Sequence, residues 1–271
     1  MTADRKFRLP KDIPLDQYPK PEAFLIEARR LIDEAQKQGL ILRVMGPIAL
    51  RYYFPGYVSL YERMERLGER VFTDIDYAAY GKHRGKLVPF FQAQGYDYDK
   101  RAMMLFGQTR HIYFSDRIPM IDVFYDGLWM NHWVDYRNRL EFHPYCVSLT
   151  DLLLQKLQIV HINNKDLKDC MLLLWAAPVG EGDVGMINAR YVAGLMVHDW
   201  GFYYTSTTNL KRVKEAMEKV PALTAEHRAV IGERADRLIE AIEDVPKSLK
   251  WKWRARTGPK QLWYNEVSDW A

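Results

Sequence analysis

Cysteine is scarce in this sequence of 271 residues, since only Cys146 and Cys170 are present. Two cysteines exclude a disulfide framework and a zinc site built on four clustered cysteines. The seven histidines form no HExxH or HxxxH motif, which argues against dedicated zinc chemistry. Long hydrophobic runs are also missing. The longest one extends from Cys170 to Val179 and falls far short of the roughly 18 residues that span a bilayer. We therefore expect no membrane segment.

No secretory signal is expected either. Residues 1–20 are charged and contain prolines instead of an apolar core, so this stretch is interpreted as an N-terminal extension. With few cysteines and no signal, a cytoplasmic protein is expected.

Positive charge is not spread over the chain. Residues 245–271 hold six Lys and Arg against two acids, so the rest of the chain carries 33 bases and 33 acids. Hydrophobic residues make up 48% of the sequence, which is enough for a sizeable core. We predict four regions: the extension 1–20, an α/β domain over 21–147, a helical domain over 148–245, and a basic, Trp-rich tail over 246–271.

Strand and helix patterns alternate through 21–147, which predicts an α+β fold with a mixed β-sheet and flanking helices. The expected elements are a helix over 21–39, a strand over 40–46, a helix over 47–54 that opens with Pro47, a strand over 72–81, a helix over 85–96, a hairpin of 101–107 and 110–116, and a strand over 118–128.

From residue 148 the pattern changes to apolar residues at helical spacing. An α-helical C-terminal half is therefore predicted. Its five helical patterns cover 149–163, 165–177, 188–200, 207–220 and 225–245, with a loop at 178–185.

Three aspartates fall within predicted strands. Asp74 and Asp76 are two residues apart, so their side chains leave the strand on the same face, about 7 Å apart along the backbone. Asp122 lies in a separate apolar strand, where an unneutralised acid is costly. Carboxylate oxygens suit Mg²⁺, which typically takes one or two carboxylates together with substrate phosphates. The pattern therefore predicts a magnesium site.

A strand, a glycine turn and a helix precede these acids, as in two-metal nucleotidyl transfer. The segments RVMGPIALRYY, RVFTDIDYAAYG, IDVFYD and LTDLLLQKLQIVHINNKDLKDCMLLL resemble the nucleotidyltransferase superfamily with a DNA polymerase beta-like fold. Within it they are similar to the AbiEii-like branch, which is associated with toxin–antitoxin systems. The resemblance covers roughly residues 40–175.

The resemblance implies roles for particular residues. Asp74, Asp76 and Asp122 match the catalytic, metal-binding acids of the superfamily. Residues matched to nucleotide binding are Gly46 at the phosphate-side turn, Arg70 and Thr73 ahead of the acid pair, and Lys156 in the helical half, while Lys165, Asp166 and Asp169 match a KD..D run.

The resemblance also implies an activity. The protein would transfer a nucleoside monophosphate from an NTP to a hydroxyl acceptor with Mg²⁺ as cofactor. The acceptor could be RNA, a protein side chain or a small alcohol such as an aminoglycoside, and an antitoxin-like protein would be a further partner.

Pro47 departs from the superfamily's pattern, which usually has Gly-Ser or Gly-Gly at the turn. Proline offers neither a hydroxyl nor a backbone N–H to a phosphate. The alternative function is therefore a non-catalytic nucleotide- or RNA-binding protein that retains the fold.

Several of these residues have a structural alternative. Asp122 could pair with an arginine such as Arg117 or Arg137. Lys156 could extend its ammonium group past an apolar helix face into solvent, and Asp169 could favour the start of its helix. Asp126, which precedes a glycine, is interpreted as a turn residue.

The tail alternates bases with tryptophans from Lys250 to Arg256. In an extended conformation it would have a basic face opposite an aromatic face and could bind RNA. The alternative is that the tryptophans pack the tail onto the helical half.

Overall fold

The structure is a computed structural model that describes residues 7–65 and 70–267. Its helices are α1 (Pro21–Lys37), α2 (Gly46–Tyr53), α3 (Val58–Arg63), α4 (Arg84–Ala93), α5 (Lys100–Phe106), α6 (Leu149–Leu157), α7 (Asn164–Ala176), α8 (Ala189–Met196), α9 (Trp200–Met217), α10 (Ala225–Asp244) and α11 (Leu249–Thr257). Its strands are β1 (Leu42–Val44), β2 (Ile75–Ala79), β3 (Asp97–Tyr98), β4 (Arg110–Phe114), β5 (Ile121–Tyr125), β6 (Gly127–Trp129), β7 (Trp133–Asp135), β8 (Val179–Gly180) and β9 (Ile187–Asn188).

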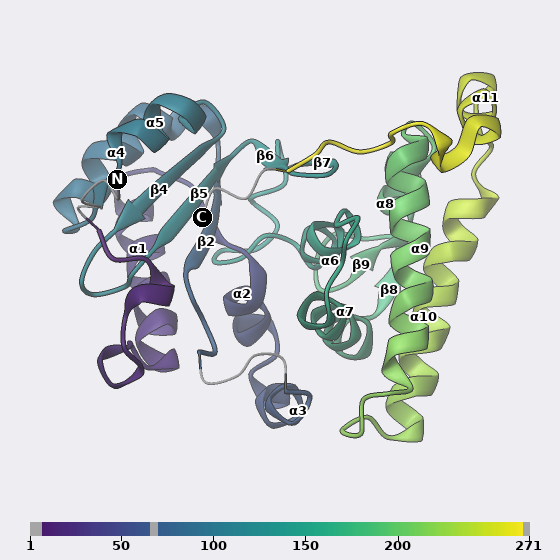
Figure 1. The fold of residues 1–271 in the computed structure, drawn as a ribbon, viewed down its shortest axis with the longest axis horizontal. Coiled ribbons are helices and arrows are strands. Elements are labelled where there is room, and N and C mark those ends of the chain that lie inside the picture. The colour runs from purple at the N-terminus through teal and green to yellow at the C-terminus, as the bar shows by residue number, and fades with distance from the viewer. Residues whose placement is uncertain (1–6, 66–69, 268–271) are drawn as a thin grey trace. The chain divides into compact units, whose positions relative to one another are not determined.

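The chain divides into two compact units. The described part of the first comprises 7–53, 70–127 and 135–147, and the described part of the second comprises 54–65, 128–134 and 148–267. The second unit starts its main stretch at residue 148, where the helical pattern begins, and it also includes two earlier segments of the chain. The fold is a mixed α+β fold with a helical C-terminal half, as the sequence predicts (Figure 1).

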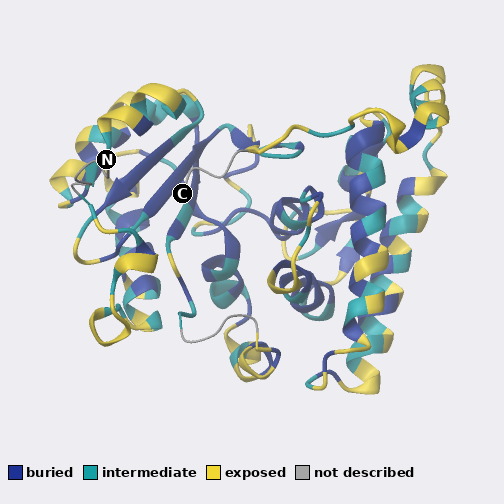
Figure 2. Cartoon of the chain, viewed as in Figure 1, coloured by how far each residue is buried: buried dark blue, intermediate teal, exposed yellow. Residues whose placement is uncertain are grey.

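The first unit is built on a five-stranded sheet in the order β1-β2-β5-β4-β3. Strands β2 and β5 are parallel, whereas the other neighbouring pairs are antiparallel. Strands β1, β2, β4 and β5 are almost entirely buried, as their mostly dark colour in Figure 2 shows. Burial on both faces explains why the sequence of β5 is an apolar run rather than an alternating pattern.

One face of this sheet is covered by α1 and α4. The Tyr77 ring of β2 and the Tyr113 ring of β4 both contact Phe91 of α4, at centroid distances of 6.5 and 4.2 Å. The Tyr77 hydroxyl donates a hydrogen bond of 3.0 Å to the Ala28 carbonyl of α1. Because side chains alternate along a strand, the acids of β2 and β5 take the opposite face.

Helices α6 to α10 of the second unit begin at capping residues. A side-chain oxygen at each start accepts a hydrogen bond from a backbone N–H of the first turn, which satisfies a donor that has no partner within the helix. These caps are Ser148 for α6, Asn163 for α7, Asn188 for α8, Asp199 for α9 and Thr224 for α10.

The segment 101–107 is a helix, so the predicted hairpin with 110–116 is wrong. The Asp99 carboxylate caps the start of α5 by accepting hydrogen bonds from the N–H groups of Arg101 and Ala102. Met and Leu, which fill the middle of this segment, lose little rotamer freedom in a helix. Strand β4 pairs instead with β3 and β5.

The tail forms helix α11 instead of an extended strand, because Ser248 caps its start through the N–H of Trp251. Tryptophans pack the tail onto α8 and α9: the Trp251 indole N–H donates to the Met196 carbonyl at 3.1 Å, and that of Trp263 donates to the Thr205 hydroxyl at 3.0 Å. Trp251 and Trp263 therefore pack the tail onto the helical half, which is the alternative to RNA binding given above.

Among the residues that the structure describes, no helix combines the length and apolar character needed to cross a bilayer.

Candidate metal site

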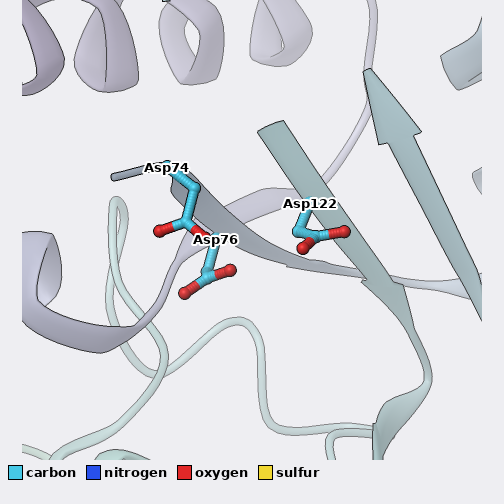
Figure 3. Close-up of side chains that lie close together, drawn as sticks. All are labelled: Asp74, Asp76 and Asp122. Atoms are coloured by element: carbon cyan, nitrogen blue, oxygen red, sulfur yellow. The ribbon is translucent and has the colours of Figure 1, made fainter. Parts of the chain in front are cut away.

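Three aspartates converge on the sheet face opposite α1 and α4 (Figure 3). Asp76 on β2 stands directly beside Asp122 on β5 in the parallel register, and Asp74 lies just before β2. One carboxylate oxygen from each residue lies within 4.8 Å of the others. The spacing of the DxD motif and the separate apolar strand thus bring together the three acids that the sequence suggested.

The donor set of this cluster fits a hard divalent cation. All three groups offer carboxylate oxygens, which Mg²⁺ and Ca²⁺ prefer, and no sulfur or imidazole ligand belongs to the described cluster. Asp122 is buried, whereas Asp74 and Asp76 are half-buried and so remain within reach of an ion and its waters. If Mg²⁺ binds here, Asp74, Asp76 and Asp122 would hold it.

Asp122 also has an arginine partner, but it is neither of the two arginines considered above. Arg110 on β4 donates from Nε to Oδ1 at 2.8 Å and from Nη2 to Oδ2 at 2.6 Å. Arg117 pairs with Glu27, and Arg137 pairs with Asp135.

All three acids of the cluster affect the pKa of the Arg110 guanidinium. Burial alone would lower its pKa, but the hydrogen bond to Asp122 and the charges of Asp122, Asp76 and Asp74 raise it above its usual value. The sequence pattern did not indicate Arg110, because its contact depends on how β4 pairs with β5. The only signal was an arginine at the start of an apolar strand.

Gly46 begins α2 immediately beside the acids. Its φ of +61° is a conformation that L side chains rarely adopt, and a Cβ built on it would lie 3.3 Å from Asp76 Oδ2. The N–H of the preceding residue, Met45, donates to the Asp76 carbonyl at 2.8 Å. Glycine therefore allows the start of α2 to approach the carboxylate, and Pro47 occupies the first turn as predicted.

Arg70 and Thr73 lie beside the N-terminal extension. Arg70 Nη2 donates to the Ile13 carbonyl at 2.7 Å, and its guanidinium lies 5.2 Å from the centroid of the Tyr18 ring. The Tyr18 hydroxyl is within hydrogen-bond distance of the Thr73 carbonyl, while Thr73 Oγ1 donates to Asp74 Oδ1 at 3.1 Å. Contacts to nucleotide by Arg70 and Thr73 remain predictions.

The pKa of the Tyr18 hydroxyl is affected by the charges of both Asp74 and Arg70. Burial and the charge of Asp74 raise its pKa to about 12, while Arg70 acts in the opposite direction. The extension therefore lies against the segment that carries the first acid, a placement that the sequence did not indicate.

Lys156 belongs to a buried ion-pair network within the helical unit. Its ammonium group lies 2.7 Å from Asp166 Oδ1 and 2.9 Å from Asp169 Oδ2, and only 12% of its side chain is exposed. The Tyr61 hydroxyl donates to the other oxygen of Asp169. The prediction that Lys156 extends its ammonium group into solvent is therefore wrong. The side chain that caps the start of α7 is that of Asn163, not that of Asp169.

Asp126 is a turn residue, as predicted. It has a φ of +60°, and its Oδ1 accepts a hydrogen bond of 2.9 Å from the N–H of Gly81. Its carboxylate is not among the three that form the cluster.

Neither known protein families nor curated proteins yield a match to this chain. Among solved structures, the chain is similar to the solution structure of the antibiotic-resistance factor ANT(2'')-Ia, with 15% sequence identity and a TM-score of 0.33, over 56% of this chain and 82% of that chain. Similarity at this level assigns neither a family nor an activity, so the functional conclusion depends on the geometry of the site.

Proposed function

We propose that this protein is a metal-dependent nucleotidyltransferase that transfers a nucleoside monophosphate from an NTP to a hydroxyl acceptor and releases pyrophosphate. The observation that supports the proposal is the convergence of Asp74, Asp76 and Asp122, whose oxygens lie within 4.8 Å of one another beside the start of α2. Three acids on one sheet face repel one another unless cations compensate them.

Each acid has a role in this proposal. Asp74 and Asp76 would hold Mg²⁺ together with the NTP phosphates, and Asp122 would complete the site and assist deprotonation of the acceptor hydroxyl. Bound Mg²⁺ supplies charge neutralisation for the triphosphate and polarises the reacting oxygen atoms. The N–H groups at the start of α2 point along the helix axis, where an anion is favoured.

Binding of NTP measured by calorimetry, with and without Mg²⁺, tests the proposal. The wild type is compared with Asp74→Ala plus Asp76→Ala for the four ribonucleotides. The control is Glu233→Ala plus Glu240→Ala, which removes the same charge from exposed positions of α10. Mg²⁺-dependent binding that only the aspartate variant loses would support the proposal, whereas a folded wild type that binds no NTP would refute it.

Labelled NTP then identifies the acceptor among RNA, protein and small alcohols. We propose RNA as the first acceptor to test, because Lys250, Lys252 and Arg256 lie exposed on α11. Changing these three residues to Gln leaves the packed Trp251 and Trp263 in place, so loss of RNA labelling would report on charge alone. Full labelling of RNA by that variant would exclude the tail as the binding surface.

An antitoxin partner and an AbiEii-like relationship remain predictions from the resemblance.

Pro47 favours a second candidate function, which is nucleotide binding without turnover. It removes one N–H from the first turn of α2, where a phosphate would otherwise find a donor. Under this alternative the wild type binds NTP but releases no pyrophosphate with any acceptor, and Pro47→Ser gains turnover. Pyrophosphate release by the wild type would exclude it.

A further inference from the structure

Arg110 occupies the coordinating edge of Asp122. Its guanidinium donates one hydrogen bond to each carboxylate oxygen, at 2.8 and 2.6 Å, in a bidentate arrangement. The Asp122 side chain is only 3% exposed and that of Arg110 is 26% exposed. Bidentate guanidinium–carboxylate pairs are among the strongest and most directional contacts in proteins.

The sheet fixes this arrangement. Ile112 is the direct neighbour of Asp122 across the antiparallel β4–β5 pair, and Arg110 faces Phe124. Arg110 and Asp122 therefore lie diagonally on the same face, within reach of a long side chain. The guanidinium also lies 5.2 Å from the centroid of the Phe124 ring, which limits the orientations open to it.

The charge of Arg110 bears on how many cations can bind on the Asp122 side of the cluster. Its guanidinium already offsets the negative charge of the Asp122 carboxylate through the bidentate pair. A second divalent ion at Asp122 would compete with two hydrogen bonds and would lie beside a fixed positive charge. Arginine does not lose its proton at accessible pH, so it cannot relieve this repulsion.

We infer that the site binds one divalent cation and that the Arg110 guanidinium takes the place of a second. The inference rests on the metal site of the proposed function and specifies its composition. Arg110 is a positioning residue, since it acts by holding the Asp122 carboxylate and by supplying charge to that side of the site.

The number of bound ions tests this inference without any turnover. Full-length protein is titrated with Mn²⁺ in the absence of nucleotide, with free Mn²⁺ followed by electron paramagnetic resonance. The wild type is compared with Arg110→Gln, Arg110→Lys and Arg137→Gln. Arg137 is the matched control because it forms an arginine–aspartate pair with Asp135 outside the acidic cluster.

We expect one Mn²⁺ per wild-type chain, one per Arg110→Lys chain, in which the positive charge is kept, and two per Arg110→Gln chain. Two ions on the wild type, or one ion bound by Arg110→Gln with the wild-type affinity, would overturn the inference and leave the proposed function standing. No Mn²⁺ on the wild type would refute the metal site itself. The number of Mn²⁺ ions bound by the wild type is measured without any variant, so the inference can be tested even if a variant fails to fold.

Discussion

Gly46 shows how one residue connects backbone conformation to the acids. It has a positive φ, and a Cβ would press on Asp76 Oδ2. We predict that Gly46→Ala lowers the free energy of unfolding by about 1 kcal/mol and weakens Mn²⁺ binding roughly tenfold, because Asp76 must move away from its place in the cluster. Urea denaturation and Mn²⁺ titration measure the two effects.

Gly39 provides the control, since it has a similar φ of +67° and a Cβ added there would meet open space. Gly39→Ala should lose similar stability with unchanged Mn²⁺ affinity. Equal Mn²⁺ affinity in both variants would contradict the role given to the approach of α2 to Asp76.

Substitution of Lys156 should affect the stability of the fold directly. Removing one partner of a buried ion pair leaves uncompensated charge, so Lys156→Met is expected to lower the free energy of unfolding by about 3 to 5 kcal/mol. Lys214→Met is the comparison, because Lys214 and its partner Asp236 are both at least one-third exposed, and it should cost less than about 1 kcal/mol. Similar losses in urea denaturation would contradict the buried network.

At the scale of elements, local capping decided where sequence periodicity was ambiguous. Segment 101–107 is a short apolar run that fits a strand or a helix, and the Asp99 cap selects the helix. In the tail, alternating bases and tryptophans suggested an extended chain, but Ser248 starts a helix instead. Each cap is visible in the sequence, yet its effect on so short a segment depends on what the segment packs against.

The docking of the C-terminal segment onto α9 depends on a glycine. A Cβ at Gly201 would lie 2.2 Å from the Trp263 carbonyl oxygen, which is backbone and cannot rotate away. We predict that Gly201→Ala undocks this segment and speeds tryptic cleavage after Lys260 about tenfold, equivalent to about 1.4 kcal/mol of docking energy. Mass spectrometry of the digest gives the rate.

The control for this experiment is Gly194→Ala in α8, where a Cβ meets open space. Its cleavage rate should equal that of the wild type, because alanine also favours the helix. Unchanged cleavage in Gly201→Ala would show that the segment adapts without undocking.

At the scale of the whole molecule, stability should fall in mild acid. Burial lowers the pKa of His111 in the first unit and of His132 in the second unit to about 4. Each folded-state pKa lies below the unfolded value of 6.5, so this stability is complete above pH 6.5 and is lost as the pH falls towards 4. The loss is about 3 kcal/mol for each histidine.

Urea denaturation between pH 7 and pH 4 measures this loss. His111→Gln and His132→Gln should each reduce the pH dependence, whereas His161→Gln, at an exposed position, should leave it unchanged. His111 Nε2 lies 3.0 Å from the Gly107 carbonyl, and its Nδ1 lies 2.8 Å from the Tyr125 hydroxyl, so protonation of Nδ1 would make that hydroxyl the acceptor in the second contact. A pH dependence that neither substitution changes would assign the loss to carboxylates.

The mixed α+β class, the helical second half and the candidate acids could all be predicted from the sequence. Hydrophobic periodicity and the two-residue spacing of Asp74 and Asp76 are local properties, because side chains alternate along any strand. The isolated Asp122 was conspicuous for an equally local reason, since it interrupts an apolar run.

Which groups meet across strands and helices depends on how the chain folds in three dimensions. The partnership of Arg110 with Asp122 follows from the antiparallel register of β4 and β5, and the burial of Lys156 between two acids follows from the packing of α6 and α7. Such contacts join residues through backbone pairing and packing rather than through spacing in the chain. A one-residue change of register would turn Arg110 to the other face of the sheet, and no pattern within its own strand specifies that register.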